Sequence, residues 1–455
     1  MGQDWVPALL ARTTETLERE FAELPEWEPA GASQTLEAMA AVLEETVRRL
    51  GDNYPYFHPL YAGQMLKPPH PVARAAYALA MKINPNNHAR DGGRASSEME
   101  IEAVSEIARM FGWREGYLGH LTSSGTLANL EALWVAGQER PGKRIVASEQ
   151  AHYTHSRISG VLKLTFSAVA ADARGRMDLN ALEGELKRGD VGTVVATLGT
   201  TAIGAVDPLP EILELAGRYG ARVHVDGAYG GYFRLIADAL DEPARQAFAA
   251  MERADSIVID PHKHGLQPYG CGCVLFKDAG VGRHYKHDSP YTYFTSKELH
   301  LGEISLECSR AGAAAVALWT TQKLLPLDCD GEFAAGLRKG RAAAKELDRR
   351  LRTDETDRFT GLAVGGPELD IVVWTVPGKG TEDSSLRARE TFAACAMRGL
   401  HLALVELPQY WFGPGDSVEA TPKTVTCLRS VLMKPEHESW LPEIWKRLSE
   451  AVNRF

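Results

Sequence analysis

The sequence predicts an α/β protein whose largest part is a mostly parallel sheet covered by helices. Between residue 98 and about residue 320, short β-branched runs alternate with segments whose apolar residues recur at helical spacing. Ligands bind such sheets at the carboxyl ends of the strands. The strand-like runs are Val194–Leu198, Arg222–Asp226, Ser256–Asp260 and Cys273–Phe276, and the helical runs are Met99–Phe111, Gly125–Gly137 and Leu209–Tyr219.

The rest of the chain predicts a helical arm before this region and a compact α+β region after it. Residues 5–50 show two helical apolar patterns, and proline residues separate them. This arm has little core of its own, so we expect it to pack on a partner subunit. Residues 51–97 are aromatic and loop-rich. We therefore expect three parts, at 1–85, 86–340 and 341–455.

Composition limits the classes of function. Hydrophobic residues make up 44% of the 455 residues and charged residues 24%, as in an ordinary globular enzyme. The net charge of −10 argues against nucleic-acid or anionic-membrane partners, because binding phosphate requires a basic face. The six cysteines include no Cys-x-x-Cys pair, and no secretory signal precedes them. We expect a cytoplasmic protein with reduced thiols and no metal site.

The stretch with the clearest chemical signal joins a strand to a glycine-rich segment. The apolar run Ile257–Ile259 stops at Asp260, and His262 and Lys263 follow after one proline. A partly desolvated lysine there is unprotonated often enough to form a Schiff base with pyridoxal 5'-phosphate (PLP). Taken alone, the motif is as consistent with a surface lysine in a loop.

A hydroxyl-rich segment offers a place for the phosphate of such a cofactor. Leu121–Asn129 contains hydroxyls and a glycine at the start of a predicted helix. A helix N-terminus binds phosphate through free backbone N–H groups and its dipole, so Ser124, Gly125 and Thr126 are candidate phosphate ligands. An ordinary N-cap explains the same residues equally well.

Three further positions suit the ring of the cofactor. Asp226 ends a buried strand, where its carboxylate would pair with a protonated pyridine nitrogen and keep the ring an electron sink. His152 follows a strand-like run and would stack on the ring and take part in proton transfer. Thr200 lies at another strand end as a candidate contact. A turn-capping aspartate, a structural histidine and ordinary turn chemistry are the alternatives.

The order of these pieces along the chain resembles the group II family of PLP-dependent amino-acid decarboxylases, which includes aromatic L-amino-acid and tyrosine decarboxylases. The resemblance covers roughly residues 50–330. It implies a fold-type I homodimer with the active site between the subunits, and it implies that His262 helps to hold the phosphate. The residues that carry it are His152, Asp226, Ala228, His262 and Lys263.

The resemblance also implies a mobile loop whose tyrosine returns a proton to the substrate Cα after CO₂ leaves. Tyr291 and Tyr293 both match this role, and Tyr285 matches it less well. Family members without that tyrosine release an aldehyde instead. We expect decarboxylation of an L-amino acid to an amine. An aldehyde-forming oxidative decarboxylase, a carbon–carbon lyase of the same fold and a non-catalytic homologue are the alternatives.

Two sets of residues predict different substrates. An aromatic wall would favour an aromatic or apolar side chain, whereas histidines and arginines would pair with an acidic one. We expect the aromatic class. By the resemblance, the hydroxyl of Ser97 approaches the substrate carboxylate. The aromatic residues are Tyr54, Tyr56, Phe57 and Tyr61, and the cationic ones are His58, His88, Arg90 and Arg94.

Overall fold

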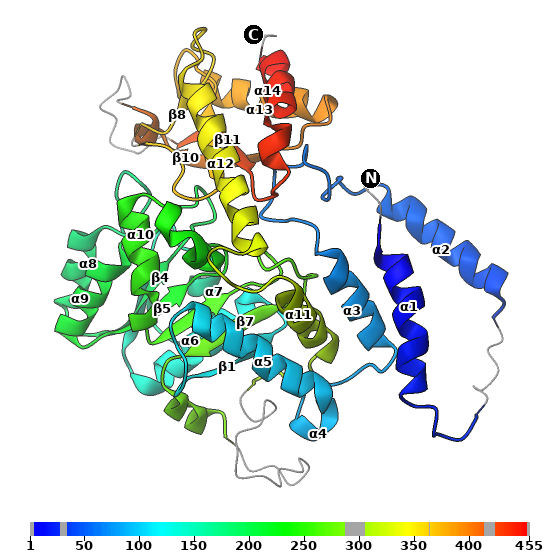
Figure 1. Cartoon of the computed structure of the whole chain (residues 1–455). Coiled ribbons are helices and arrows are strands. Elements are labelled where there is room, and N and C mark those ends of the chain that lie inside the picture. The colour runs from blue at the N-terminus through cyan, green and yellow to red at the C-terminus, as the bar shows by residue number, and fades with distance from the viewer. Residues whose placement is uncertain (1–3, 28–33, 287–304, 364, 414–423, 453–455) are drawn as a thin grey trace.

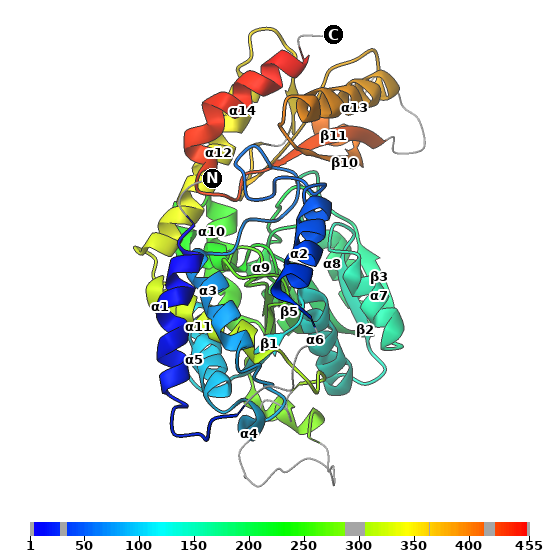
Figure 2. The same cartoon turned by 90° about the vertical axis from the view of Figure 1, so that its right-hand side faces the viewer.

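The structure, a computed structural model, describes residues 4–27, 34–286, 305–363, 365–413 and 424–452. A large α/β domain carries a smaller α+β domain at one end, and an N-terminal arm lies along one side (Figure 1). In that arm, α1 (Val6–Arg19) lies beside α3 (Pro71–Met81). The second helix, α2 (Leu36–Leu50), buries none of its residues and lies on the outside of the molecule (Figures 1 and 2).

The large sheet has seven strands in the order β1-β7-β6-β5-β4-β2-β3. β7 is antiparallel to both of its neighbours, and the other pairs are parallel. The prediction of a mostly parallel sheet is therefore confirmed. The strands are β1 (Leu118–Thr122), β2 (Arg144–Ser148), β3 (Phe166–Val169), β4 (Val191–Thr197), β5 (Arg222–Asp226), β6 (Ser256–Ile259) and β7 (Gly272–Phe276).

Alternate residues of these strands enter two different cores, as the period of two in a strand requires. Ile145 and Val195 pack with Leu133 of one covering helix. Their neighbours Val146 and Val194 belong to the core on the other face. The first face is covered by α6 (Gly125–Glu139) and α7 (Thr154–Val161), and the second by α5 (Ala95–Met110), α8 (Leu179–Leu186), α9 (Leu209–Tyr219) and α10 (Glu242–Ala249).

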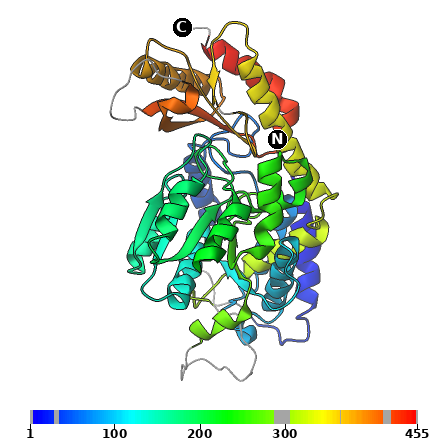
Figure 3. The same ribbon diagram turned by 90° about the vertical axis from the view of Figure 1, so that its left-hand side faces the viewer.

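The small domain is an antiparallel sheet of order β10-β11-β9-β8 backed by helices. Helix α12 (Glu332–Arg352) runs from the large domain into the small one (Figures 1 and 3). The division at 1–85, 86–340 and 341–455 stays a proposal, and its second boundary falls inside α12. The remaining elements are β8 (Thr360–Gly361), β9 (Ile371–Thr375), β10 (Ala403–Pro408), β11 (Thr424–Val431), α13 (Thr381–Met397) and α14 (His437–Val452).

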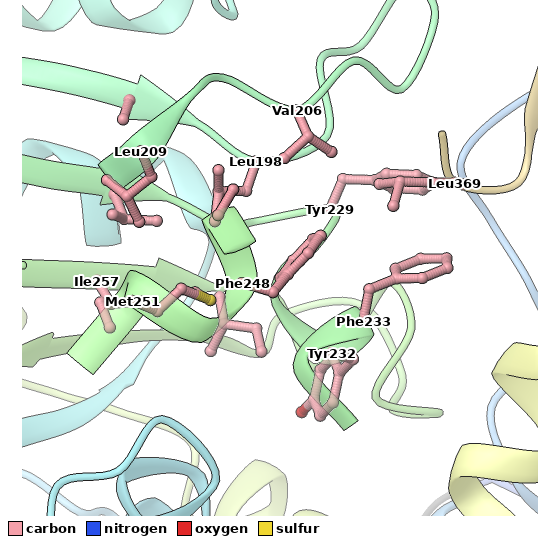
Figure 4. Packing of buried hydrophobic residues seen from close by; sticks show 14 of the residues in the cluster. Leu198, Val206, Leu209, Tyr229, Tyr232, Phe233, Phe248, Met251, Ile257 and Leu369 are labelled. Carbon is pink, nitrogen blue, oxygen red and sulfur yellow. The ribbon is translucent and has the colours of Figure 1, made fainter. Parts of the chain in front are cut away.

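An aromatic cluster joins the two domains beside the strand ends. Tyr229, Tyr232 and Phe233 follow β5 and are almost fully buried. Leu369, which precedes β9 of the small domain, packs in the same cluster (Figure 4). The segment after β5 is thus held from both domains, which fixes the residues at the end of that strand.

The expectation that residues 51–97 are loop-rich is wrong for two segments. Residues Pro71–Met81 form α3, which packs against α11 (Gly312–Leu324), and Arg90–Gly93 form the short helix α4. Pro71 occupies the first turn of α3, where its missing N–H and fixed φ are favourable. The prolines before residue 71 indicated a loop, so the start of this helix was not predicted, although the alanine-rich run that follows is a good helix former.

Neither a membrane-spanning helix nor a metal-ligand cluster occurs within the described ranges. Their helices are too short or too polar to cross a bilayer. No three His, Cys, Asp or Glu side chains among these residues come together as metal ligands. All six cysteines are free thiols, four of them buried.

Candidate active site

The carboxyl ends of β4, β5 and β6 border a cavity of about 190 Å³. Its lining includes eight residues predicted from the sequence, which come from four different segments of the chain. The first turn of α6 forms one end of the cavity, and the segments that follow β5 and β6 form the other walls. The eight are Ser124, Gly125, Thr126, His152, Asp226, Ala228, His262 and Lys263.

Lys263 lies in the short connection between β6 and β7. Its backbone N–H donates to the carbonyl of Asp260 at 2.9 Å, which makes a tight turn directly after the strand. Its Nζ lies 3.2 Å from Oδ2 of Asp260. Next to it, the ring of His262 is buried and donates from Nδ1 to the carbonyl oxygen of Cys271 at 2.6 Å. The turn therefore presents the lysine amine to the cavity beside a buried carboxylate.

Asp226 is the last residue of β5 and is buried. Its Oδ1 accepts the backbone N–H of Ala228 at 3.1 Å, and its Oδ2 lies 2.8 Å from Nε2 of His155. Burial by itself raises the pKa of Asp226. The hydrogen bond and charge of His155, together with the charge of Lys263 and the N–H of Ala228, outweigh that effect and hold the pKa below its ordinary value. Asp226 is thus a carboxylate at neutral pH, with lone pairs left for another donor.

Sequence reasoning missed His155. The residue lies in the first turn of α7, and its ring is almost fully buried. Its Nδ1 has no hydrogen-bond partner within the part of the chain that the structure describes. The sequence does show a second histidine three residues after His152. Its contact with Asp226 depends on how α7 packs on the sheet, which the sequence pattern does not reveal.

His152 presents a neutral ring to the cavity. Its Nδ1 accepts the backbone N–H of Thr154 at 3.2 Å, so the ring hydrogen is on Nε2 in the neutral form. Burial lowers the pKa of His152. A neutral imidazole with one fixed tautomer suits stacking on an aromatic ring.

The first turn of α6 forms the polar end of the cavity. Ser124 is the N-cap, and its Oγ accepts the N–H of Leu127 at 3.2 Å. A Cβ on Gly125 would overlap both carboxylate oxygens of Asp260, so only glycine allows this approach. Sequence reasoning also missed Asn129, which lines the cavity one turn later and donates to the carbonyl of Gly125 at 2.9 Å.

Thr200 braces a turn and is absent from the lining of the cavity. Its side chain is fully buried, and its Oγ1 accepts the N–H of Ala205 at 3.0 Å. Thr197, Gly199 and Thr201 of the same segment line the cavity in its place. The strand end was therefore located correctly, but its side chains alternate between the cavity and the turn.

The five predicted substrate contacts do not line this cavity within a single chain. His58 packs on Trp440 with ring centroids 4.9 Å apart, and Ser97 is fully buried in α5 with an unpartnered Oγ among the described residues. Tyr285 is buried against α6 and donates to Glu131 at 3.1 Å. The other predicted contacts are Tyr56, Phe57 and His88, and the loop candidates Tyr291 and Tyr293 lie outside the described residues.

Comparison with known proteins identifies the family. The pattern described as the pyridoxal-dependent decarboxylase conserved domain matches residues 28–360. The chain belongs to this family. An L-tyrosine decarboxylase of Enterococcus faecium is 28% identical, over 75% of this chain and 72% of that protein. An L-2,4-diaminobutyrate decarboxylase of Rhizobium meliloti is 30% identical, over 72% of this chain and 68% of that protein.

Solved structures of this fold agree with the architecture. Oryza sativa TDC, solved with PLP and tryptamine, has a TM-score of 0.78 at 18% identity. The match covers 100% of this chain and 99% of that one. Rhodiola rosea 4-hydroxyphenylacetaldehyde synthase has a TM-score of 0.75 at 17% identity, over 99% of this chain and 96% of that one. At these identities the likeness supports the fold-type I architecture and nothing finer.

The cavity suits PLP, the cofactor of this enzyme. Lys263 supplies an amine, and Asp226 supplies a buried carboxylate with oxygen lone pairs left to accept another hydrogen bond. The first turn of α6 supplies backbone N–H groups for the phosphate. Bound PLP supplies an electron sink for the bond that breaks at the substrate Cα. The enzyme is a carboxy-lyase that decarboxylates an amino acid.

Proposed function

We propose that the enzyme converts an aromatic L-amino acid to the corresponding amine and CO₂. The observation that carries this proposal is a run of aromatic rings leading to the cavity. Tyr269 stacks on His262 with centroids 4.8 Å apart, and His262 lines the cavity. Burial raises the pKa of Tyr269, and Asp260 and then Tyr56 add to the rise. Tyr56 in turn packs edge-on against Tyr61 at 4.8 Å.

An aromatic surface of this kind favours a flat, apolar side chain over a charged one. In this proposal Tyr56 and Phe57 contact the substrate side chain. Ser97 approaches the substrate carboxylate, and His58 and His88 are the contacts that an acidic substrate would use instead. The similarity to an L-tyrosine decarboxylase supports the aromatic class.

Each residue of the cavity has a distinct role in the proposed mechanism. Lys263 would hold the cofactor through its side-chain amine. Asp226 is ionised and would keep a proton on the pyridine nitrogen of the cofactor, and His155 orients that carboxylate. His152 would pack on the cofactor ring and exclude water from it. A tyrosine of the 284–307 stretch, Tyr291 or Tyr293, returns the proton to Cα.

The phosphate is held at the first turn of α6. Ser124, Gly125 and Thr126 provide hydroxyl and backbone donors there, and His262 and the Thr197–Thr201 segment complete the lining. Ala228 lies beside Asp226 and leaves room for the ring. Thr200 supports this wall through its bond to Ala205.

We also propose that the enzyme is a homodimer built on α2. The apolar face of this helix is exposed in the single chain, and Val42, Leu43 and Val47 are each more than half accessible, at 67%, 63% and 66%. An amphipathic helix with an uncovered apolar face requires a partner. A partner subunit is the expected source of the substrate contacts that the single chain leaves outside the cavity.

Light scattering tests the dimer. The wild type is expected to have the mass of two chains. A Leu43→Glu, Val47→Glu double variant is expected to have the mass of one, whereas the exposed control Glu44→Ala remains a dimer. A wild type that stays monomeric at micromolar concentration contradicts this proposal.

Product analysis tests the reaction. The holoenzyme is incubated in air with L-tyrosine, L-tryptophan, L-aspartate and L-2,4-diaminobutyrate, and amines are measured by mass spectrometry beside a peroxide assay. We expect an aromatic amine without peroxide. Lys263→Ala is expected to abolish turnover, and Lys277→Ala, at an exposed lysine after β7, to preserve it. Faster turnover of aspartate contradicts the aromatic class, and an aldehyde with peroxide contradicts simple decarboxylation.

A further inference from the structure

A second cavity, of about 390 Å³, lies where the two domains meet. It shares no lining residue with the active-site cavity, and its volume falls in the usual range for small-molecule sites, about 300–1,000 Å³. Its walls come from the segment before α3, the connection that follows Lys263, the start of α12 and the segment before α14. Nothing in the decarboxylation mechanism uses it.

The floor of this cavity contains a buried lysine without a partner. Lys67 is only 8% exposed, yet it makes no hydrogen bond or ion pair with any residue that the structure describes. Burial lowers the pKa of Lys67 to about 8, and the negative charges of Asp370 and Glu436 offset only part of that effect. The side chain of Lys67 is largely buried, but its Nζ remains accessible to the cavity, so an anion bound there would supply the acceptor that the described residues do not.

A second buried lysine lies close to the first. Lys434 is 2% exposed, and its Nζ donates to the carbonyl of Tyr61 at 2.6 Å, which uses one of its three donors. Burial lowers the pKa of Lys434 to about 7, and repulsion from Lys67 contributes to the decrease. Two ammonium groups that repel each other at the floor of a cavity are a natural site for a carboxylate.

The rim of the cavity has the opposite charge. Glu332 and Glu436 are exposed at its edge, and Pro68, Leu266 and Phe333 provide apolar walls. The rim would repel a polyanion such as a phosphate ester. It would attract the amino group of a ligand whose carboxylate reaches the floor. We propose that this cavity is a second binding site, for a small zwitterion that carries one carboxylate and one amino group.

The second cavity is connected to the active site through two sets of residues. Leu266, three residues after Lys263, forms part of its wall, and its carbonyl accepts the N–H of His70 at 2.9 Å. Leu266 has a φ of 62°, an unusual conformation for a bulky residue. Asp370, whose charge acts on Lys67, accepts the hydroxyl of Tyr229 at 2.5 Å, and Tyr229 lines the active site. The second cavity and the active site are thus linked by direct contacts through Leu266 and Asp370.

Calorimetry on the holoenzyme tests the site with four probes that separate the two charges. They are 4-aminobutyrate, butyrate, butylamine and inorganic phosphate. We expect 4-aminobutyrate to bind, butyrate to bind more weakly, and butylamine and phosphate not to bind. Lys67→Met keeps the apolar stem and is expected to weaken 4-aminobutyrate at least tenfold. The matched control is Lys339→Met, at an exposed lysine of α12.

A footprint on the wild type gives a local readout that does not depend on a variant folding. Saturating 4-aminobutyrate is expected to slow acetylation of Lys67 and Lys434, measured by peptide mass spectrometry, and to leave Lys339 unchanged. The proposal is overturned by equal binding to Lys67→Met, by phosphate as the tightest probe, or by no protection of Lys67. None of these outcomes bears on whether the enzyme decarboxylates an aromatic amino acid.

Discussion

The bond between His155 and Asp226 makes a specific prediction about His155→Leu. Among the described residues, His155 is the only side chain that hydrogen-bonds to the Asp226 carboxylate, and the substitution removes this bond. The carboxylate then keeps one donor, the backbone N–H of Ala228. The leucine fills most of the space of the ring, so the main change is the lost hydrogen bond. His155→Gln is the matched variant, because its amide can still donate to the carboxylate.

The geometry sets the size of the effect. A hydrogen bond to a charged group contributes about 1.5–3 kcal/mol, and Asp226 is buried, so solvent screens little of it. At 1.36 kcal/mol per pKa unit, losing the bond raises the pKa of Asp226 by about 1–2 units. If the full bond energy is lost in the transition state, kcat falls by about 10- to 100-fold. His155→Gln is expected to recover most of that loss.

Two readouts separate this positioning role from a purely structural one. The first is the split between kcat and KM: kcat is expected to fall in His155→Leu while KM stays near its wild-type value, because Asp226 faces the cofactor site rather than the substrate side chain. The second is the absorbance of the bound cofactor, which reports the protonation of its ring. A kcat for His155→Leu within twofold of the wild type, with unchanged cofactor absorbance, would refute the reasoning.

Three further predictions follow from buried contacts. Gly125→Ala places a methyl group against the Asp260 carboxylate, so PLP affinity measured by titration should fall at least about tenfold. Arg310→Met leaves Glu100 buried without its ion-pair partner at 2.6 Å, and the free energy of unfolding in urea should drop by about 3–5 kcal/mol. Burial raises the pKa of Asp370 to about 6, so the folded state binds the proton of this carboxyl more tightly than the unfolded state does. This proton binding stabilises the folded state fully below about pH 4, and the stabilisation is lost as pH rises through 6. Asp370→Asn stays neutral, so its Tm relative to the wild type should rise between pH 4 and pH 8, by the equivalent of at most about 3 kcal/mol.

Each of these has a control or a contrary outcome. Gly160→Ala adds a methyl group where no atom lies within 4 Å, so it should leave PLP affinity unchanged. An Arg310→Met variant that loses less than about 1 kcal/mol would contradict a buried ion pair. A Tm difference for Asp370→Asn that is flat with pH would contradict the raised pKa.

Local patterns were enough to locate the strands and the residues at their ends. The predicted run Arg222–Asp226 is β5 residue for residue, and Ser256–Asp260 differs from β6 by one residue. Both strands are short buried β-branched runs that end at a polar residue, and that pattern depends only on neighbours in sequence. Lys263 and Asp226 lie together because parallel strands end at the same edge of a sheet.

Contacts between distant segments were beyond the reach of sequence patterns. His155 reaches Asp226 because α7 packs against α6 and the sheet, and the spacing of residues on one helix does not reveal that packing. Thr200 was assigned to the cavity because its strand end was correct, yet which hydroxyl of a turn faces inward depends on its backbone. Lys67 appears in the sequence as an ordinary lysine before two prolines, and only the tertiary structure shows that it is buried.

The most direct test of the central claim is to map the lysine that holds the cofactor. Borohydride reduction of the holoenzyme fixes PLP to that lysine, and peptide mass spectrometry locates it. The account predicts a single modified peptide containing Lys263, which is lost in Lys263→Ala and retained in Lys277→Ala. Modification of a different lysine, or equal modification of the Lys263→Ala variant, would contradict the assignment of this cavity as the active site.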